Sequence, residues 1–204
     1  DYTASIAIAD TAGNTGSSNT DTFSADNTDP AASIDTQPAD NNNNNDDATF
    51  TFSGTDATSG VASFECNFDS AGYGACVSGD DMGDDLTDGT HTLDVRAIDA
   101  AGNTGSAASY SWLVDTTDPA AAITSDIVWS NDGTATVTFT ASDGGSGIAS
   151  CTLTLSHATE ADQTDTSCAN GNGQATFNVA DGVDYTASIA IADTAGNTGS
   201  SNTD

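Results

Sequence analysis

The chain has 204 residues, of which 31 are acidic and one is basic, so its formal net charge is -30 at pH 7. A surface this acidic excludes nucleic acid as a partner, because nucleic-acid binding depends on basic groups that neutralise phosphates. Hydrophobic residues make up 36% of the chain, and no segment approaches the ~20 apolar residues of a membrane helix, so we expect no membrane span in this segment.

The acidic residues are almost all aspartates, since only Glu65 and Glu160 are glutamates. Repulsion between so many like charges weakens a compact fold unless salt screens it or divalent cations neutralise it. Short Asp side chains carry hard oxygen ligands of the kind that calcium prefers. The charge therefore predicts a saline, halophilic habitat, calcium binding, or both.

The chain begins with a sequence that it later repeats. Residues Asp1–Asp21, DYTASIAIADTAGNTGSSNTD, recur without a change at Asp184–Asp204. Strand patterning alone does not produce such an identity. The repeated segment therefore indicates a tandem array, of which this chain covers slightly more than one period. We interpret residues 1–27 as the last two strands of a preceding module.

A first complete module is predicted over residues 28–115. Apolar and polar residues alternate in four segments bounded by Gly, Asn and Asp, which is the pattern of half-buried strands. The segments are Ala48–Ser53, Val61–Phe68, Thr90–Ile98 and Ser109–Val114. The tract Asn41–Asn45, followed by two aspartates, predicts a solvated turn between the first two strands of this module.

A second module is predicted over residues 116–204, without its final strand. Its alternating segments are Ala135–Ala141, Ile148–Leu155, Gln174–Val179 and Tyr185–Ala192. Three landmarks recur in both modules in the same order: an Asp-Pro linker, a Ser-Gly-Val or Ser-Gly-Ile turn, and an Ala-Gly-Asn-Thr-Gly turn. Helical periodicity is absent, so each unit of about ninety residues is predicted to be a small β-sandwich.

The four cysteines fall as two local pairs, one in each half of the chain: Cys66 with Cys76, and Cys151 with Cys168. Four cysteines allow three connectivities, and pairing within each half is the one that repeats with the modules. We therefore expect two disulfides and an oxidising compartment. A zinc site is the alternative, but it requires shorter spacings and clustered histidines.

A set of motifs in the first module is recognisable. It comprises Phe64-Glu65-Cys66, Cys76, the stretch DGTHTLDVRAIDAAGNT from Asp88, Trp112, and Val114-Asp115-Thr116-Thr117-Asp118-Pro119. This set resembles the bacterial Ig-like repeats of large secreted and surface proteins. The second module shares only the linker and the two turns. The resemblance implies an all-β chain of tandem immunoglobulin-like β-sandwiches, about seven strands each, strung end to end in adhesins, stalks and fibres, and rarely an enzyme.

In an immunoglobulin-like sandwich the linker and two loops meet at one pole, and both modules have acidic residues there. The first module would group Asp29, Asp56, Asp99 and Asn103. The second would group Asp118, Asp143, Asp193 and Asn197, with Asp88 and Asp115 near the same junction. Calcium takes six to eight oxygen ligands at about 2.3–2.6 Å, which these groups could supply with carbonyls and water. We therefore expect calcium to stiffen the module junctions.

Turn chemistry alone is the competing interpretation of the same residues. Asp29 and Asp118 each precede a proline, while Asp99 and Asp193 can orient turns through Asx hydrogen bonds. Asn103 and Asn197 also tolerate a left-handed backbone conformation.

No motif predicts catalysis. His91 lies on a predicted strand and His157 in a predicted loop, neither beside a nucleophile in an activating context. Most aromatic residues alternate with polar ones and are expected in the core. Surface positions for Trp129 and Tyr73 would instead favour carbohydrate binding.

The predicted partner is the protein itself, head to tail. If the polypeptide continues beyond this segment, the array is covalent. If it does not, the final strand of one subunit could complete the open edge of the next by β-addition. The donated residues would be Thr22, Phe23, Ser24, Ala25, Asp26 and Asn27.

The sequence thus predicts a non-catalytic structural repeat unit of an extracellular filament, fibre or cell-surface stalk. A spacer in a cell-surface adhesin and a carbohydrate-binding module are the alternatives.

Overall fold

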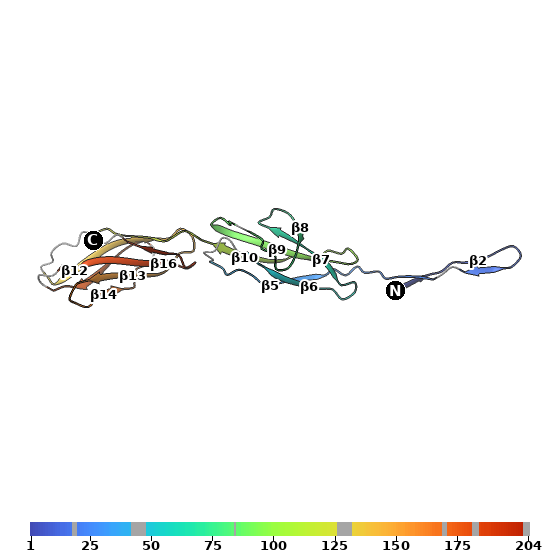
Figure 1. The fold of residues 1–204 in the computed structure, drawn as a ribbon, viewed down its shortest axis with the longest axis horizontal. Helices are drawn as coiled ribbons and strands as arrows, with labels where there is room; N and C mark the ends of the chain where they lie inside the picture. The colour runs from blue at the N-terminus through green and yellow to red at the C-terminus, as the bar shows by residue number, and fades with distance from the viewer. Residues whose placement is uncertain are drawn as a thin grey trace. The chain divides into compact units, whose positions relative to one another are not determined.

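The computed structural model describes residues 1–17, 20–41, 48–83, 85–125, 132–168, 171–180 and 184–201. Every regular element among them is a β-strand, which confirms the all-β prediction (Figure 1). No helix suited by length and apolar character to crossing a membrane occurs in these ranges.

The chain divides into two compact units. The first comprises Asp1–Thr36, Thr51–Asp80 and Leu93–Tyr110, and the second comprises Gln37–Phe50, Asp81–Thr92 and Ser111–Asp204. Segments of residues 28–115 fall in both units, so the predicted module boundaries at 28–115 and 116–204 stay predictions.

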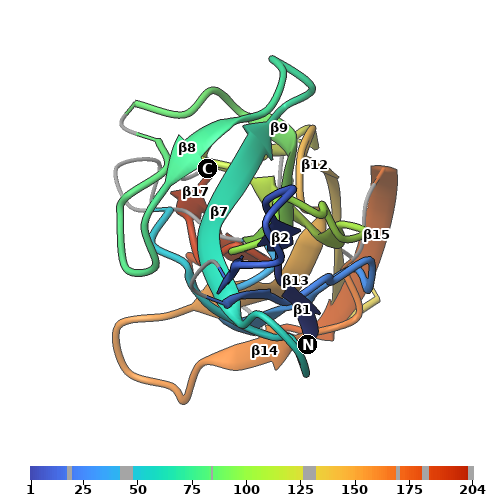
Figure 2. The same ribbon diagram turned by 90° about the vertical axis from the view of Figure 1, so that its right-hand side faces the viewer.

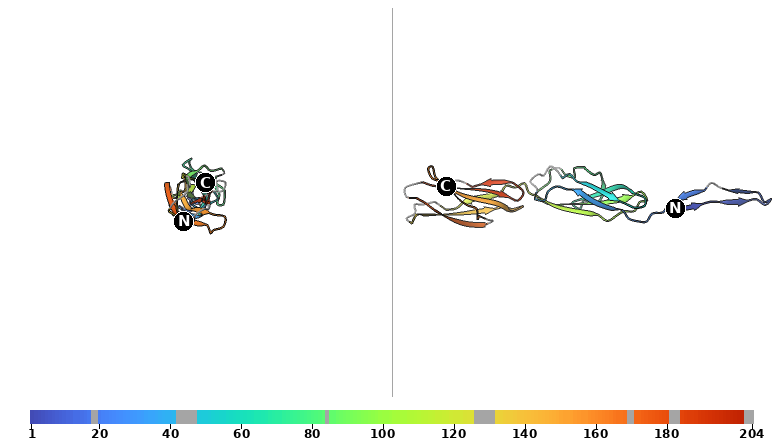
Figure 3. Two further views of the ribbon diagram at one scale, coloured as in Figure 1. Left: turned by 90° about the vertical axis from the view of Figure 1, so that its left-hand side faces the viewer. Right: turned by 90° about the horizontal axis from the view of Figure 1, so that it is seen from below.

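The first strands form a hairpin that contains β1 (Tyr2–Ala4), β2 (Ala7–Ala9), β3 (Thr15–Ser17) and β4 (Asp21–Phe23). β2 pairs with β3 and β1 pairs with β4, both antiparallel, as the blue ribbon of Figure 3 shows. Every residue in these four strands is exposed. The predicted last strand, Thr22–Asn27, is shorter than expected, because only its first two residues belong to β4.

The first module contains two sheets. One pairs β5 (Ala31–Thr36) with β6 (Thr51–Thr55). The other has the order β10-β9-β7-β8, and Figure 2 shows β7 beside β8 and β9. Its strands are β7 (Val61–Phe68), β8 (Gly74–Cys76), β9 (Gly89–Asp99) and β10 (Ala108–Val114).

Phe50, Phe52 and Trp112 lie in the interior of the first module, as predicted. Phe50 packs edge-on against Trp112 with ring centroids 5.2 Å apart, and both side chains are buried. Phe52 packs in the same way on the half-buried Phe64, at 5.1 Å. Burial in β9 alternates along the strand because successive side chains point to opposite faces of a sheet.

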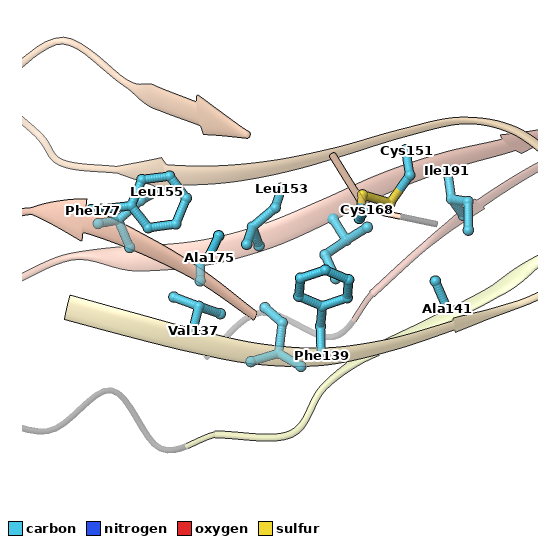
Figure 4. Packing of buried hydrophobic residues seen from close by; sticks show 13 residues of the cluster. Val137, Phe139, Ala141, Cys151, Leu153, Leu155, Cys168, Ala175, Phe177 and Ile191 are labelled. Carbon is cyan, nitrogen blue, oxygen red and sulfur yellow. A yellow bond between two sulfur atoms is a disulfide. The ribbon is translucent and has the colours of Figure 1, made fainter. Parts of the chain in front are cut away.

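The second module also contains two sheets. The first has the order β11-β12-β15 and is made of Ala120–Ile123, Thr134–Ser142 and Gly171–Asn178. The second has the order β14-β13-β16-β17 and is made of Gln163–Asp165, Ile148–Ser156, Thr186–Asp193 and Thr198–Ser200. Their inner faces share one buried cluster, in which Val137, Phe139 and Phe177 of one sheet meet Leu153 and Ile191 of the other (Figure 4).

Both predicted disulfides are present. Cys66–Cys76 joins the neighbouring strands β7 and β8, and Cys151–Cys168 joins β13 to the segment after β14. The second disulfide is part of the buried cluster of its module (Figure 4). Each disulfide therefore closes a short loop within one half of the chain.

The predicted strand segments coincide with β6, β7, β9, β10, β12, β13, β15 and β16 to within a few residues at their ends. The short strands β8 and β14 and the first strands β5 and β11 had no distinct pattern in the sequence. Most of the asparagine tract and Trp129 lie outside the described residues.

Candidate cation sites at the two linkers

Three aspartates converge where the linker enters each module, and the two clusters occupy equivalent places in the repeat. In the first, Asp26, Asp56 and Asp99 each offer a carboxylate oxygen, and these oxygens all lie within 4.8 Å of one another. In the second, Asp115, Asp143 and Asp193 meet the same criterion. We call these the first and the second aspartate cluster.

Strand ends position the members of each cluster. In the second cluster, Asp143 directly follows β12 and Asp193 is the last residue of β16. Asp115 directly follows β10 and opens the linker to Pro119. A β-strand fixes the direction in which the chain leaves the sheet, so three strand ends at one pole bring these aspartates together although they are far apart in sequence.

Backbone amides surround the carboxylate of Asp56. Its Oδ2 accepts hydrogen bonds from the amides of Thr58, Ser59 and Gly60 at 2.9, 2.8 and 2.9 Å. These donors, that of Gly60 first, hold the pKa of Asp56 below its ordinary value of 3.8. The equivalent Asp143 accepts from the amides of Gly145 and Gly147. Backbone donors thus surround one carboxylate oxygen in both loops.

Asp99 organises the turn after β9. Its Oδ1 accepts hydrogen bonds from the amides of Ala101 and Asn103, and its Oδ2 accepts one from the Asn103 side chain at 2.7 Å. Burial raises the pKa of Asp99, but these donors outweigh burial, so its pKa lies below the ordinary value. Asp193 and Asn197 make the same side-chain contact at 2.7 Å.

The asparagine of each turn also holds the linker. Asn103 Nδ2 donates to the carbonyl oxygens of Asp26 and Thr28 at 3.2 and 3.4 Å. Asn197 Nδ2 donates to the carbonyl oxygens of Asp115 and Thr117 at 2.8 and 3.4 Å. The predicted Asx turns are therefore formed, and they serve a further purpose because they attach each linker to the module that follows it.

The linker aspartates complete the clusters. Asp26 Oδ2 accepts a hydrogen bond from the amide of Ser59 at 3.1 Å, and Asp115 Oδ2 accepts one from Ser146 at 2.6 Å. The carboxylate of Asp115 lies against Gly145, where a Cβ atom would collide with it. The absence of a side chain at Gly145 therefore makes room for Asp115 in the second cluster.

One buried carboxylate oxygen of the first cluster accepts no hydrogen bond from the described residues. Oδ1 of Asp56 is buried and has no hydrogen-bond partner among the described residues, although a buried polar atom without a partner is costly. Three ionised carboxylates so close together also repel one another. A hard divalent cation would remove both penalties, and an all-oxygen ligand set of this kind suits calcium.

The structure rearranges the predicted ligand sets. Asp56, Asp99, Asp143 and Asp193 lie where the sequence placed them, and Asn103 and Asn197 lie beside them. Asp29 and Asp118 are exposed and outside the clusters. The linker member of the first cluster is Asp26, which the sequence analysis did not name, and that of the second is Asp115, which it named near the second junction.

Asp88 lies near the second cluster without joining it. Its carboxylate accepts hydrogen bonds from Thr116 and Thr117. Its role is therefore to hold the linker segment that follows Asp115.

Sequence reasoning missed Asp26 as a cluster member. The signal was available, because Asp26 and Asp115 each stand four residues before the proline of an Asp-Pro linker.

Of the two aromatic residues named for carbohydrate binding, Trp129 lies outside the described residues and Tyr73 lies at the surface, as that alternative requires. Tyr73 is 38% exposed, but the guanidinium of Arg96 lies over its ring at 3.8 Å from the centroid. Arg96 also pairs with Glu65 at 2.6 Å. One face of the ring is thus already covered by a cation that is itself neutralised.

Part of the chain matches a known protein family. Residues 113–204 match the model of the family described as bacterial Ig-like domain, which confirms the predicted resemblance, although the sequence had placed the stronger likeness on the first module. No curated protein matches the chain.

Two solved structures show weaker likeness. One is a tetra-tandem repeat in the extending region of a large adhesion protein, with 25% identity, coverage of 98% of this chain and 55% of that one, and a TM-score of 0.41. The other is dimeric latent PorU from Porphyromonas gingivalis, with 16% identity, coverage of 88% and 20%, and a TM-score of 0.32. The chain thus spans about half of the first structure and a fifth of the second. The fold assignment rests on the strands and on the family match.

Proposed function

We propose that this chain is a non-catalytic structural repeat unit of an extracellular filament, fibre or cell-surface stalk built from tandem Ig-like modules. The observation that carries the proposal is the repetition of one linker arrangement. In both modules the same Asp, Asn and Pro positions fix the segment that enters the sandwich. A repeated, fixed linker serves length and stiffness. A spacer in a surface adhesin would have the same mechanical role.

The cysteines support the proposed location. Both pairs are disulfide-bonded and none of the cysteines is free. Disulfides of this kind persist outside the reducing cytosol. A module of about ninety residues with few large apolar side chains also gains stability from a covalent cross-link. These points support an extracellular or surface location.

Calcium is the proposed cofactor of the two aspartate clusters. In the first cluster Asp26 belongs to the linker, while Asp56 and Asp99 belong to loops of the sandwich. A cation bound to all three would pin the linker to the module more firmly than the Asn103 hydrogen bonds alone. It would also lower the repulsion that a net charge of -30 imposes. Saline surroundings would screen the same repulsion, so the halophilic proposal is compatible with it.

The mechanical role is tested by the dimensions of proteins that contain one, two and three copies of the repeat in series. We expect small-angle X-ray scattering to give a maximum dimension that grows in proportion to copy number, because fixed linkers do not let successive modules fold back. A dimension that grows as about the square root of the copy number, as for flexible linkers, would contradict the proposal.

The calcium part is tested separately by thermal melting of the full chain after chelation and during titration. A ligand that binds only the folded state stabilises it by about 2.7 kcal/mol at one hundred times its Kd. We expect the melting temperature to rise with calcium and to stay lower in sodium chloride of equal ionic strength. An unchanged melt at millimolar calcium would remove calcium from the proposal and leave the mechanical role standing.

A further inference from the structure

One sheet face of the second module carries no charge. Residues of β12 and β15 alternate between buried and outward-facing positions. The outward-facing residues of β12 are threonines and a serine, and those of β15 are asparagines, a glutamine and a threonine. None of these side chains is acidic, although the chain has 31 acidic residues. We call the outward-facing residues of β12 and β15 the uncharged face.

The first module shows that such neutrality does not follow from the fold. Asp35 and Thr124 each follow the proline of their linker by the same distance in the sequence. Asp35 brings a carboxylate to its sheet, and its Oδ1 accepts hydrogen bonds from the hydroxyl groups of Ser33 and Ser53, both at 3.1 Å. Thr124 instead shares a hydrogen bond with the hydroxyl group of Thr138, at 3.1 Å. Of the two modules, the second therefore has the uncharged surface.

A shallow groove of about 680 Å³ lies on the uncharged face. Its polar lining consists of hydroxyl and amide side chains, those of Thr124, Thr138, Thr140, Asn172 and Gln174. Phe139 and Gly173 also line it, but Phe139 points into the buried cluster of the module (Figure 4). A Cβ atom at Gly173 would lie 2.3 Å from the Phe139 ring, so the ring packs directly behind this part of β15 and closes the floor of the groove. Ligand sites have volumes of about 300–1,000 Å³, and the groove lies within that range.

Strand pairing places the amides and hydroxyl groups of the groove opposite one another. Gln174 pairs with Thr138, and Asn172 pairs with Thr140. Directly opposed side chains on one face of an antiparallel pair have Cβ atoms about 4.5–5.5 Å apart. The exposed side-chain amides of Asn172 and Gln174 have no hydrogen-bond partner among the described residues. The groove thus presents two rows of hydrogen-bonding groups, and its amides are available to a ligand.

The chemistry of this lining favours a neutral ligand that is rich in hydroxyl groups. A side-chain amide offers two donors and one acceptor oxygen, and a threonine hydroxyl group both donates and accepts. Sugar hydroxyl groups also donate and accept. An anionic ligand is opposed by the net charge of -30, and a cation finds no carboxylate in the groove lining. A neutral glycan meets all of these conditions.

We propose that the groove on the uncharged face of the second module binds a neutral glycan chain. The amides of Asn172 and Gln174 bind sugar hydroxyl groups from β15, and the threonines of β12 bind them from the opposite side. These residues differ from Trp129 and Tyr73, which the sequence suggested for carbohydrate binding. Because Phe139 is buried, the groove lacks an aromatic stacking platform among its lining residues, so one groove binds weakly.

Repetition compensates for weak binding at one groove. Multivalent attachment raises overall affinity by about 10²–10⁴ without any new contact. This gain rests on the proposed role as a repeat unit, whereas the site itself does not.

Glycan binding is measured by amide chemical-shift changes in NMR spectra of the full, isotope-labelled chain. The probes are cellohexaose, maltohexaose and mannohexaose, which are neutral, and hexagalacturonate, which is anionic. A chelator keeps calcium from the aspartate clusters, so that a sugar cannot bind there through a cation. We expect at least one neutral probe to shift the amides of residues 138–140 and 172–174 with a Kd on the order of 1 mM. Absence of shifts with all three neutral probes at about 10 mM, or equal shifts with hexagalacturonate, would overturn the proposal.

Thr138→Val and Thr136→Val are a matched pair of variants on β12. Each replaces a hydroxyl group with a methyl group of similar size, and each removes a hydrogen bond of 3.1 Å, to Thr124 or to Thr176. Only Thr138 lines the groove. We expect Thr138→Val to weaken glycan binding at least about threefold and Thr136→Val to bind like the wild type.

Gln174→Ala and Asn178→Ala repeat the comparison on β15, because both residues are exposed and only Gln174 lines the groove. We expect Gln174→Ala to weaken binding about tenfold, since an amide can make several hydrogen bonds to a sugar. The same spectra show whether each variant is folded. Equal binding by the groove variants and their controls would place the sugar elsewhere and refute the proposed site.

A second copy of the chain is the other occupant that an uncharged face could take. In that case the amides of residues 138–140 and 172–174 would shift on dilution without any sugar, and the glycan proposal would be wrong. Neither scattering by covalent repeats nor the calcium melt depends on the groove, so the proposed function stands or fails separately.

Discussion

The side-chain amide of Asn197 donates a hydrogen bond to the backbone carbonyl oxygen of Asp115 at 2.8 Å. It joins the turn after β16 to the linker after β10, and Asn103 repeats the contact with the carbonyl oxygen of Asp26 at 3.2 Å. Residues that are distant in the sequence thus determine how each linker enters its module.

Asn197→Ala removes three hydrogen bonds, to Asp115, Thr117 and Asp193. We expect the second module to lose about 1–3 kcal/mol of unfolding free energy, because buried acceptors are left without a donor. Denaturant unfolding measures the loss. Asn178→Ala, an exposed position on β15, is the control and should change little. Equal stability of the two variants would show that the Asn197 contacts are dispensable.

Gly199→Ala places a methyl group against the Pro119 carbonyl oxygen. Overpacking of this kind costs about 1–3 kcal/mol, since the linker or the turn must move. Gly144→Ala is the matched control, because a Cβ there meets nothing within 4 Å. Thermal melting should separate the two variants. If the two variants had the same melting temperature, the close approach of Gly199 to the Pro119 carbonyl oxygen would be unimportant for stability.

Asp143→Asn tests the second aspartate cluster as a calcium site. The substitution keeps the shape of the side chain but removes one of three converging carboxylates. We expect the calcium-dependent rise in melting temperature to shrink, with weaker apparent calcium affinity by calorimetry. The control Asp162→Asn makes the same charge change at an exposed residue. An undiminished calcium response in Asp143→Asn would place the cation elsewhere.

Acid is expected to destabilise the first module, because the pKa of Asp56 and of Asp99 is lower in the folded chain than the ordinary 3.8. A group with a depressed folded pKa contributes stability above its unfolded pKa and loses it as pH falls through the folded value. Denaturant unfolding without calcium, from about pH 5 to about pH 2, should show this loss.

Asp99→Asn should flatten that pH profile, whereas Asp29→Asn, an exposed residue outside the cluster, should leave it unchanged. An equally steep profile in Asp99→Asn would mean that other carboxylates govern the acid response.

Reduction of the disulfides is expected to lower the stability of both modules. Opening a loop of about 15 residues costs about 3 kcal/mol in the chain-entropy account, and the two bridges close loops with sequence separations of 10 and 17. Melting with and without reductant measures the effect. A melt that does not respond to complete reduction, verified by thiol titration, would contradict a stabilising role.

Local features of the sequence determined much of this protein. Alternation of apolar and polar residues identified strands such as β7 and β9, because period-two burial follows from strand geometry alone. Cysteine spacing determined both disulfides, and the recurring linker and turns revealed the repeat.

Tertiary structure decided which residues meet. Asp26 rather than Asp29 joins Asp56 and Asp99, because the point at which the linker passes the loops depends on strand pairing over the whole sandwich. Tertiary structure also decided the environment of each side chain, since Ile8 is exposed whereas Ile191, its counterpart in the identical repeated segment, is buried in the core. Burial depends on which sheets surround a segment, and those sheets come from parts of the chain that the segment does not itself encode.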